Sequence, residues 1–174
     1  TGGHEQRADS IVHEVTKYWR SLFQKKPTNR EDHDTCLATL RTGNRVQPPT
    51  AEKCGQLIRE AEVVSTCNTL PTRKSAGPDR VPNKFYKVMS KIVGPILTEV
   101  FNESHSQGCF AAGFSDGIIS TLYKKNDRDD PRNYRSITLL NSDYKILMRI
   151  LTARMNEAVV QLVSPCQNGF VPDS

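Results

Sequence analysis

The chain has 174 residues, of which 36% are hydrophobic, and its formal net charge is +5. This length allows one domain, or a piece of one, with a single hydrophobic core. No apolar run reaches the roughly 18 residues of a membrane span and the start has no secretory signal pattern, so we expect an intracellular protein of the cytoplasm or nucleus, neither secreted nor bound to a membrane.

The positive charge is unevenly distributed. Residues 1–70 contain 10 Lys and Arg against 9 Asp and Glu, whereas residues 71–174 contain 14 against 10. A basic excess in one half is typical of a surface that approaches a nucleic acid. The five cysteines form no C-x-x-C pair, and none of them pairs with a histidine at zinc-ligand spacing. We expect free thiols and no metal site.

The first 70 residues are predicted to be mainly helical. An apolar stripe at helical spacing ends before Pro27, and Trp19 in it is more typical of a core residue than of a stacking platform. Residues 27–49 are polar, with a possible short helix near 36–40. A further helix is expected after Thr50 as its N-cap, with Cys54, Leu57, Ile58, Ala61, Val64 and Leu70 on its inner face.

Two helices are predicted after the turn Gly77-Pro78-Asp79. Pro82 suits the first turn of one, with a buried face of Phe85, Val88, Met89 and Ile92. Gly94-Pro95 is expected to open the next, with Ile96, Leu97, Val100 and Phe101 inward and Gly108 as its C-terminal stop.

Two short runs of strand-forming residues, Ile118–Tyr123 and Ser136–Leu140, flank a charged, turn-forming segment. They predict an antiparallel hairpin that brings Lys124 and Arg135 onto one surface, where two cations could hold a polyphosphate. A solvated charged loop explains the same spacing. Its aspartates fail the spacing of an EF-hand, so we interpret them as a solvated tip. Asn141 or Ser142 then caps a long helix, about 143–163, with Lys145, Arg149 and Arg154 outside its apolar stripe.

Three blocks in order resemble the reverse transcriptases of non-LTR (LINE-type) retrotransposons. They are SAGPDRVPNKFYK (75–87), KKNDRDDPRNYRSITLLNSDYKIL (124–147) and QNGFVPDS (167–174). The resemblance implies RNA-directed DNA synthesis, with an RNA template, a DNA primer and deoxynucleoside triphosphates as partners. It implies an α+β fold, mostly helical, in which the hairpin is part of the fingers of a right-hand polymerase. A helical extension (1–70) would precede the fingers part (71–174).

The resemblance also implies site residues. Lys124 and Arg135 match the family's lysine and arginine that contact the phosphates of the incoming nucleotide. Weaker candidates for nucleic-acid contact are Lys74, Arg80, Lys125, Gln167, Gly169 and Phe170. Arg80 and Asn126 replace glycines of the family pattern. If position 80 needs a positive φ, Arg80 strains the turn, whereas asparagine tolerates that conformation.

The family's catalytic aspartates follow the third block, where this sequence ends. We therefore expect a piece without the palm and thumb of the same polyprotein, with no catalytic residue, that does not extend a primer alone. Mg²⁺ is expected only for the complete enzyme. Two alternatives stay open: a non-catalytic module that binds RNA or DNA, and a decayed retrotransposon copy, which the departures at Arg80, Ser136 and Asp173-Ser174 would fit.

Overall fold

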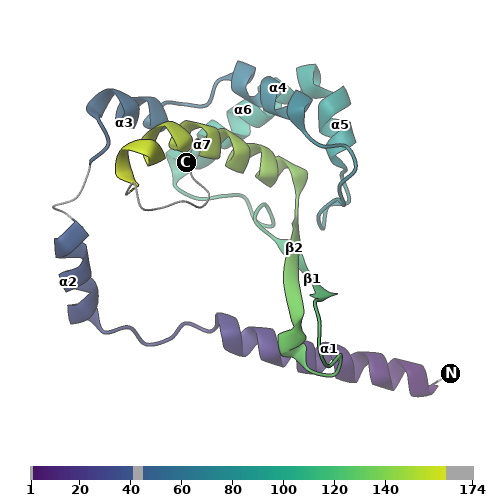
Figure 1. The fold of residues 1–174 in the computed structure, drawn as a ribbon. Coiled ribbons are helices and arrows are strands. Elements are labelled where there is room, and N and C mark those ends of the chain that lie inside the picture. The colour runs from purple at the N-terminus through teal and green to yellow at the C-terminus, as the bar shows by residue number, and fades with distance from the viewer. Residues whose placement is uncertain (1, 41–44, 164–174) are drawn as a thin grey trace. The chain divides into compact units, whose positions relative to one another are not determined.

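The computed structural model describes residues 2–40 and 45–163 (Figure 1). The chain is α+β and mostly helical, as predicted, with one two-stranded antiparallel sheet in these residues. In chain order the elements are α1 (Gly2–Phe23), α2 (Arg30–Leu40), α3 (Pro48–Gly55), α4 (Glu60–Thr69), α5 (Asn83–Val88), α6 (Ser90–Gln107), β1 (Gly117–Tyr123), the 3₁₀ turn η1 (Pro131–Asn133), β2 (Tyr134–Leu140) and α7 (Ser142–Leu162).

The chain forms two compact units. The first combines Thr1–Thr42 with Thr121–Ser136, that is, α1 and α2 with the outer part of the hairpin; the second contains Gly43–Ser120 and Ile137–Ser174. The predicted boundary at residue 70 divides the chain by sequence motif and stays a prediction. Within the described residues, no helix is both long and apolar enough to cross a bilayer.

The hydrophobic core lies in the second unit, where α4, α6 and α7 pack together. Its fully buried members include Val63 and Cys67 of α4, Phe101 of α6 and Ile146 of α7. Burial raises the pKa of the Cys67 thiol, so this cysteine behaves as a small hydrophobic residue. Gly94 lets α6 approach α4, because a Cβ there would lie 2.6 Å from Val64 Cγ2.

The helix predicted from Thr50 to Leu70 is two helices, so that prediction is wrong at its middle and its start. Gln47 is the N-cap of α3, and two prolines fill its first positions. Arg59 is the N-cap of α4, where its backbone N–H donates to Glu62 Oε2 at 2.9 Å. Between the helices Ile58 is buried and its backbone N–H donates to Asn102 Oδ1 at 2.8 Å, which fixes an extended linker that periodicity alone does not reveal.

The predicted buried face after Pro82 is also wrong. Asn83 and Tyr86 are buried, whereas Phe85 is 45% and Val88 is 70% exposed. The helical phase restarts at Met89, whose backbone separates α5 from α6. The next helix was expected to open at Gly94-Pro95, but α6 begins at Ser90 and contains this pair. Phe101 is buried as expected, whereas Ile96 and Val100 are exposed. Gly108 ends α6 with φ +67°, as predicted.

Arg154 was predicted to lie outside the apolar stripe of α7, and this is wrong. Its side chain is 9% exposed and its Nη2 lies 2.7 Å from Glu62 Oε2. The guanidinium also donates to the backbone carbonyls of Gln56 and Leu57. This hydrogen bonding by Arg154 is the main cause that lowers the pKa of Glu62 below its usual range. Arg154 therefore ties α7 to the linker between α3 and α4.

The apolar stripe of α1 is largely exposed, and the core position predicted for Trp19 is met only in part. Ile11 is 58%, Val12 63% and Phe23 64% exposed. Trp19 is partly buried and stacks on Phe23 with ring centroids 5.8 Å apart. The spacing predicted the helix correctly, but spacing alone does not say whether a partner surface covers it.

Candidate nucleic-acid interface

The register of the hairpin decides which side chains share a face. The Lys124 backbone N–H donates to the Asn133 carbonyl at 2.8 Å, and the rings of Tyr123 and Tyr134 lie opposite each other with centroids 5.6 Å apart. Side chains alternate along a strand and opposite residues share a face, so Arg135 of β2 lies on the face opposite to the tyrosines. Lys124 directly follows β1, and continuing the alternation past Tyr123 places it diagonal to Arg135 on the same face. The predicted pairing of these two cations is therefore compatible with the observed register.

The opposite face of the outer hairpin carries Tyr123 and Tyr134, which stabilise the tip. The Tyr123 hydroxyl donates to the Asn126 carbonyl at 2.6 Å, and the Tyr134 hydroxyl donates to the Arg128 carbonyl at 2.8 Å. Asn126 adopts φ +72°, which asparagine tolerates, as expected. The contacts that hold the tip together are thus made by the tyrosines, on the face opposite to Lys124 and Arg135.

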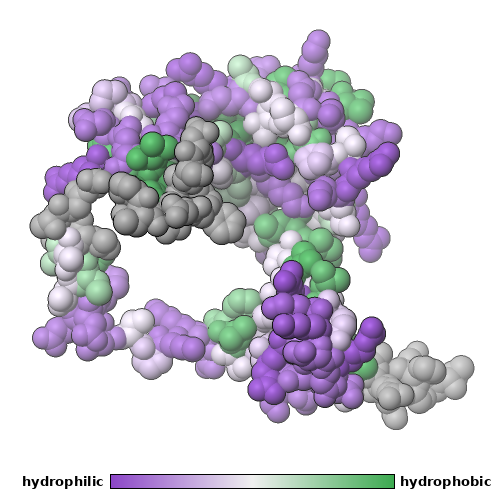
Figure 2. All heavy atoms as spheres, in the orientation of Figure 1, coloured by the Kyte–Doolittle hydropathy of each residue, from purple (hydrophilic) through white to green (hydrophobic). Residues whose placement is uncertain are grey.

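The cations of the tip fall into two groups. Arg128 lies 4.6 Å above the centre of the Tyr123 ring, and Arg132 Nη2 lies 2.7 Å from Asp130 Oδ2. Lys124, Lys125 and Arg135 are exposed and have no side-chain hydrogen bond or ion pair within the described residues. Figure 2 shows the tip as a hydrophilic cluster next to the more hydrophobic strands. The three predicted cations are therefore the ones that remain available to an anion.

Two of the three aspartates of the tip, Asp127 and Asp130, accept local hydrogen bonds, whereas Asp129 is exposed, as predicted for a solvated tip. Asp127 Oδ1 accepts from the Asp129 backbone N–H at 3.0 Å, and Asp130 Oδ1 accepts from the Arg132 backbone N–H at 2.9 Å. The neighbouring Arg132 lowers the pKa of the Asp130 carboxyl. In the part of the chain that the structure describes, no group of three or more His, Cys, Asp or Glu is arranged to hold a metal ion.

A second group of predicted residues lies on the loop before α5, in the other unit. Gly77 packs against the start of α7 so closely that a Cβ would collide with Asn141 N and Oδ1. The Asp79 backbone N–H donates to Asn141 Oδ1 at 3.1 Å. Ser142 Oγ lies 3.0 Å from the Val81 carbonyl oxygen and 2.8 Å from Asn83 Oδ1. Residues 77–83 and 141–142, from two of the three sequence blocks, are thus fixed to each other.

Arg80 adopts φ +60°, so the position does require the left-handed region. This confirms the expected strain, since a non-glycine residue pays a steric penalty there. Its backbone N–H donates to the Gly77 carbonyl at 3.0 Å, which closes the turn. Arg80 is exposed.

Lys74 lines a cavity of about 330 Å³ that sequence reasoning did not identify. Two further cations line it, Lys145 and Arg149, which lie one turn apart on α7. Sequence reasoning placed both outside the apolar stripe of α7, but it had no signal that Lys74, about seventy residues earlier, shares their surface. We call this cavity the α7 basic pocket; its lining is Leu70, Pro71, Lys74, Ser75, Asn83, Leu139, Lys145 and Arg149.

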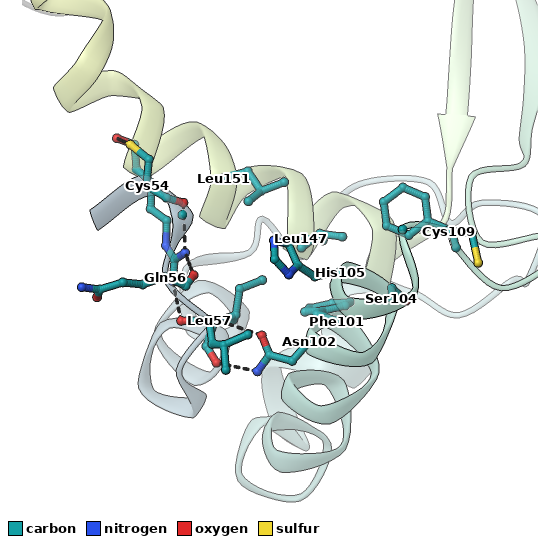
Figure 3. A pocket seen from close by; sticks show the side chains of 15 residues that line it. Cys54, Gln56, Leu57, Phe101, Asn102, Ser104, His105, Cys109, Leu147 and Leu151 are labelled. Atoms are coloured by element: carbon teal, nitrogen blue, oxygen red, sulfur yellow. Dashed lines mark hydrogen bonds between the residues drawn. The ribbon is translucent and has the colours of Figure 1, made fainter. Parts of the chain in front are cut away.

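Two other cavities contain fewer of the predicted features. A mainly apolar pocket of about 290 Å³ lies among the α3–α4 linker, α6 and α7, with Phe101 and Leu147 in its wall (Figure 3). None of the predicted site residues lines it. In the first unit, α1 and the hairpin tip enclose a cavity of about 430 Å³ that Trp19, Arg128 and Tyr134 help to line. Neither cavity concentrates cations as the α7 basic pocket does.

The predicted site residues therefore form separate groups. Lys124, Lys125 and Arg135 belong to the first unit, and Lys74 and Arg80 belong to the second. Gln167, Gly169 and Phe170 lie outside the described residues. The structure thus supports two local surfaces, and each is considered by itself.

Comparison with known proteins supplies the remaining observation. No family model matches the chain. The chain is 24% identical over 173 residues to the "Transposon TX1 uncharacterized 149 kDa protein" of Xenopus laevis, covering 94% of this chain. It is 28% identical over 159 residues to the "Probable RNA-directed DNA polymerase from transposon BS" of Drosophila melanogaster, covering 90% of this chain.

The chain is related to transposon-encoded proteins. It spans 12% of the length of the first relative and 17% of the second. What those names describe belongs to proteins several times longer than this one.

Proposed function

We propose that this chain is part of the fingers of a retrotransposon RNA-directed DNA polymerase and that its hairpin binds the phosphates of the incoming deoxynucleoside triphosphate. The observation that carries the proposal is the hairpin register, which puts Lys124 and Arg135 on one exposed face without a carboxylate partner in the described residues. The similarity to a transposon protein named as a probable RNA-directed DNA polymerase supports this assignment.

The chemistry of the two cations suits this task. The guanidinium of Arg135 can donate two parallel hydrogen bonds to phosphate oxygens, whereas the ammonium of Lys124 acts as a compact point charge. Together they would neutralise and orient a triphosphate. Mg²⁺ would assist the leaving group in a complete enzyme, but the described carboxylates of this chain do not fit a metal site. We therefore assign phosphate binding, and no catalytic step, to these residues.

A titration of the 174-residue protein with a deoxynucleoside triphosphate, followed by ¹H–¹⁵N NMR, tests the proposal. We expect shifts centred on residues 122–135, and at least a tenfold loss of affinity, or roughly 1.4 kcal/mol, in a Lys124→Gln/Arg135→Gln variant. The matched control removes one lysine and one arginine from α1 of the same unit, Lys17→Gln/Arg20→Gln. Equal losses in the two variants, or shifts that leave the hairpin unchanged, would contradict the proposal.

A second function, a non-catalytic module that holds RNA or DNA, is favoured by the α7 basic pocket. RNA template and DNA primer are the partners that the polymerase assignment supplies, and their phosphates could contact Lys74 and Arg80. The two functions differ in ligand. The fingers assignment requires binding of a free triphosphate at the hairpin, whereas a simple binding module requires only salt-dependent binding of a strand.

A further inference from the structure

We infer that the α7 basic pocket is a binding site for a backbone phosphate of a nucleic-acid strand, with Lys145 and Arg149 as contact residues in addition to Lys74. This inference rests on the proposed function only in taking a nucleic acid as the source of the phosphate. Its cations differ from those of the hairpin tip, so the two assignments can be tested separately.

The first argument is the composition of the pocket. Leu70 and Asn83 are 2% and 3% exposed, and they provide a rigid, buried base. Three cations line the cavity, and its lining residues include no aspartate or glutamate. A concave, low-dielectric wall with charges of one sign concentrates the electrostatic potential and attracts the opposite charge. An anion is therefore the ligand class that this pocket fits.

The second argument is that the cations are positioned by structure. Lys145 and Arg149 are separated by four residues in α7 and so project from one side of the helix. The loop that carries Lys74 is held at both of its ends. Asn83 Nδ2 donates to the Pro71 carbonyl at 2.9 Å, and the Asp79 backbone N–H donates to Asn141 at the start of α7.

The third argument is the absence of internal partners. Two other cations of the same unit are paired, Arg154 with Glu62 and Lys53 with Glu157, each at 2.7 Å. Lys74, Lys145 and Arg149 have no side-chain hydrogen bond or ion pair in the part of the chain that is described. Like charges four residues apart on a helix destabilise it slightly. The arrangement therefore destabilises the helix slightly, and a bound anion would relieve the repulsion.

The source of the phosphate distinguishes a strand from a free nucleotide. A strand offers the pocket one phosphodiester among several along a basic surface, and the contacts carry no base specificity. A triphosphate would instead concentrate several charges at one place. We assign the strand because the cations are spread over a loop and successive turns of a helix instead of converging on one point.

Fluorescence anisotropy with labelled single-stranded RNA oligonucleotides of two unrelated sequences tests the inference on the full 174-residue protein. In a Lys145→Gln/Arg149→Gln variant, we expect the affinity at 0.1 M salt to fall by about fivefold per cation, equally for both sequences. The slope of log K against log salt should decrease by about 0.7 per lost contact. The control Lys87→Gln/Lys91→Gln removes two cations of the same unit that do not line the pocket.

Thermal unfolding separates binding from a structural function of these cations. We expect the Lys145→Gln/Arg149→Gln variant to melt at or slightly above the wild-type temperature, because a repulsion is removed. A clear drop in melting temperature would assign the cations to stability and overturn the inference. Wild-type RNA affinity in this variant, or a loss no larger than in the control, would overturn it as well.

Two further comparisons distinguish the sources of phosphate and the two proposals. One outcome is that a free deoxynucleoside triphosphate competes with RNA in the wild-type protein but not in the pocket variant. That result would identify a nucleotide, not a strand, as the ligand of the pocket and would overturn the assignment. The Lys124→Gln/Arg135→Gln variant should keep the contribution of the pocket to RNA binding. If the hairpin titration fails while the pocket variant loses RNA affinity, the fingers assignment is wrong and the pocket stands.

Discussion

Two arginines in the middle of α7 are used in opposite ways. Arg149 is exposed, lines the α7 basic pocket beside Lys145, and has no partner within the described residues. Five residues later, Arg154 is buried and its guanidinium is satisfied by Glu62 and by backbone carbonyls of the α3–α4 linker. The difference teaches that the partners of a cation, rather than its position in an amphipathic pattern, separate a structural arginine from one that is available for binding.

Single substitutions of Arg154 and Arg149 test this comparison most directly. Arg154→Met should destabilise the protein by about 3 kcal/mol, because Glu62 and two backbone carbonyls lose their partner in a partly buried place. Arg149→Met, the matched change on the same helix, should alter stability by less than about 0.5 kcal/mol. Urea denaturation followed by circular dichroism measures both. Similar losses for the two variants would remove the distinction between the two arginines of α7.

Sequence patterns predicted the elements of this fold better than the faces that they bury. The hairpin was predicted within two residues at each end, because β-branched runs and a turn-forming segment are local signals. Arg154 was missed because its burial depends on Glu62, more than ninety residues away, and charged side chains are assigned to the surface by default. The inner face of α5 was missed because the polar Asn83 is buried together with Tyr86, and the helical phase then changes at Met89.

The candidate site residues show the same difference between local and long-range signals. Lys124 and Arg135 could be proposed from a hairpin alone, since the pairing of two strands that are joined by one connecting segment is a local relation. The α7 basic pocket could not, because it needs the contact between the loop after α4 and α7. One signal for that contact was present in the sequence: a glycine in the turn Gly77-Pro78-Asp79. Its physical reason, the approach of Asn141, appears only in the structure.

The next largest effect on stability is expected at the contact between Gly77, in the loop before α5, and Asn141 at the start of α7. Gly77→Ala should cost about 2 kcal/mol, because the added methyl group collides with Asn141 and forces the loop away from α7. It should also weaken RNA binding, since Lys74 moves with the loop. Gly55→Ala is the control: nothing lies within 4 Å of its Cβ position, and a change within about 0.5 kcal/mol is expected. Denaturation and RNA anisotropy of the two variants measure the difference.

A Gly77→Ala variant with wild-type stability would mean that the loop adapts without loss. A variant that is destabilised but binds RNA normally would mean that the pocket does not depend on the loop, and so would remove Lys74 from it. Either result would weaken the comparison of the two arginines, because the pocket that Arg149 lines is expected to depend on this loop, whereas the ion pair of Arg154 is not.

The smallest effect concerns Arg80, an unpaired cation in a strained turn. Arg80→Gly should stabilise the protein by roughly 0.5–1 kcal/mol, because glycine adopts φ +60° without a steric penalty but loses more entropy on folding. Asn126→Gly is the matched control at φ +72° and should gain less, since asparagine already tolerates that region. Thermal unfolding measures both gains.

The RNA affinity of the Arg80→Gly variant then shows whether the strained arginine also binds RNA. If Arg80 contacts the template, the Arg80→Gly variant gains stability and loses about fivefold in affinity at 0.1 M salt, as one phosphate contact would require. If it gains stability with unchanged affinity, the arginine is a departure without a binding function, as a decayed element would accumulate. A loss of stability would contradict the strain itself. Each result shows whether the cation has a partner and which molecule supplies it. The same property distinguishes Arg149 from Arg154.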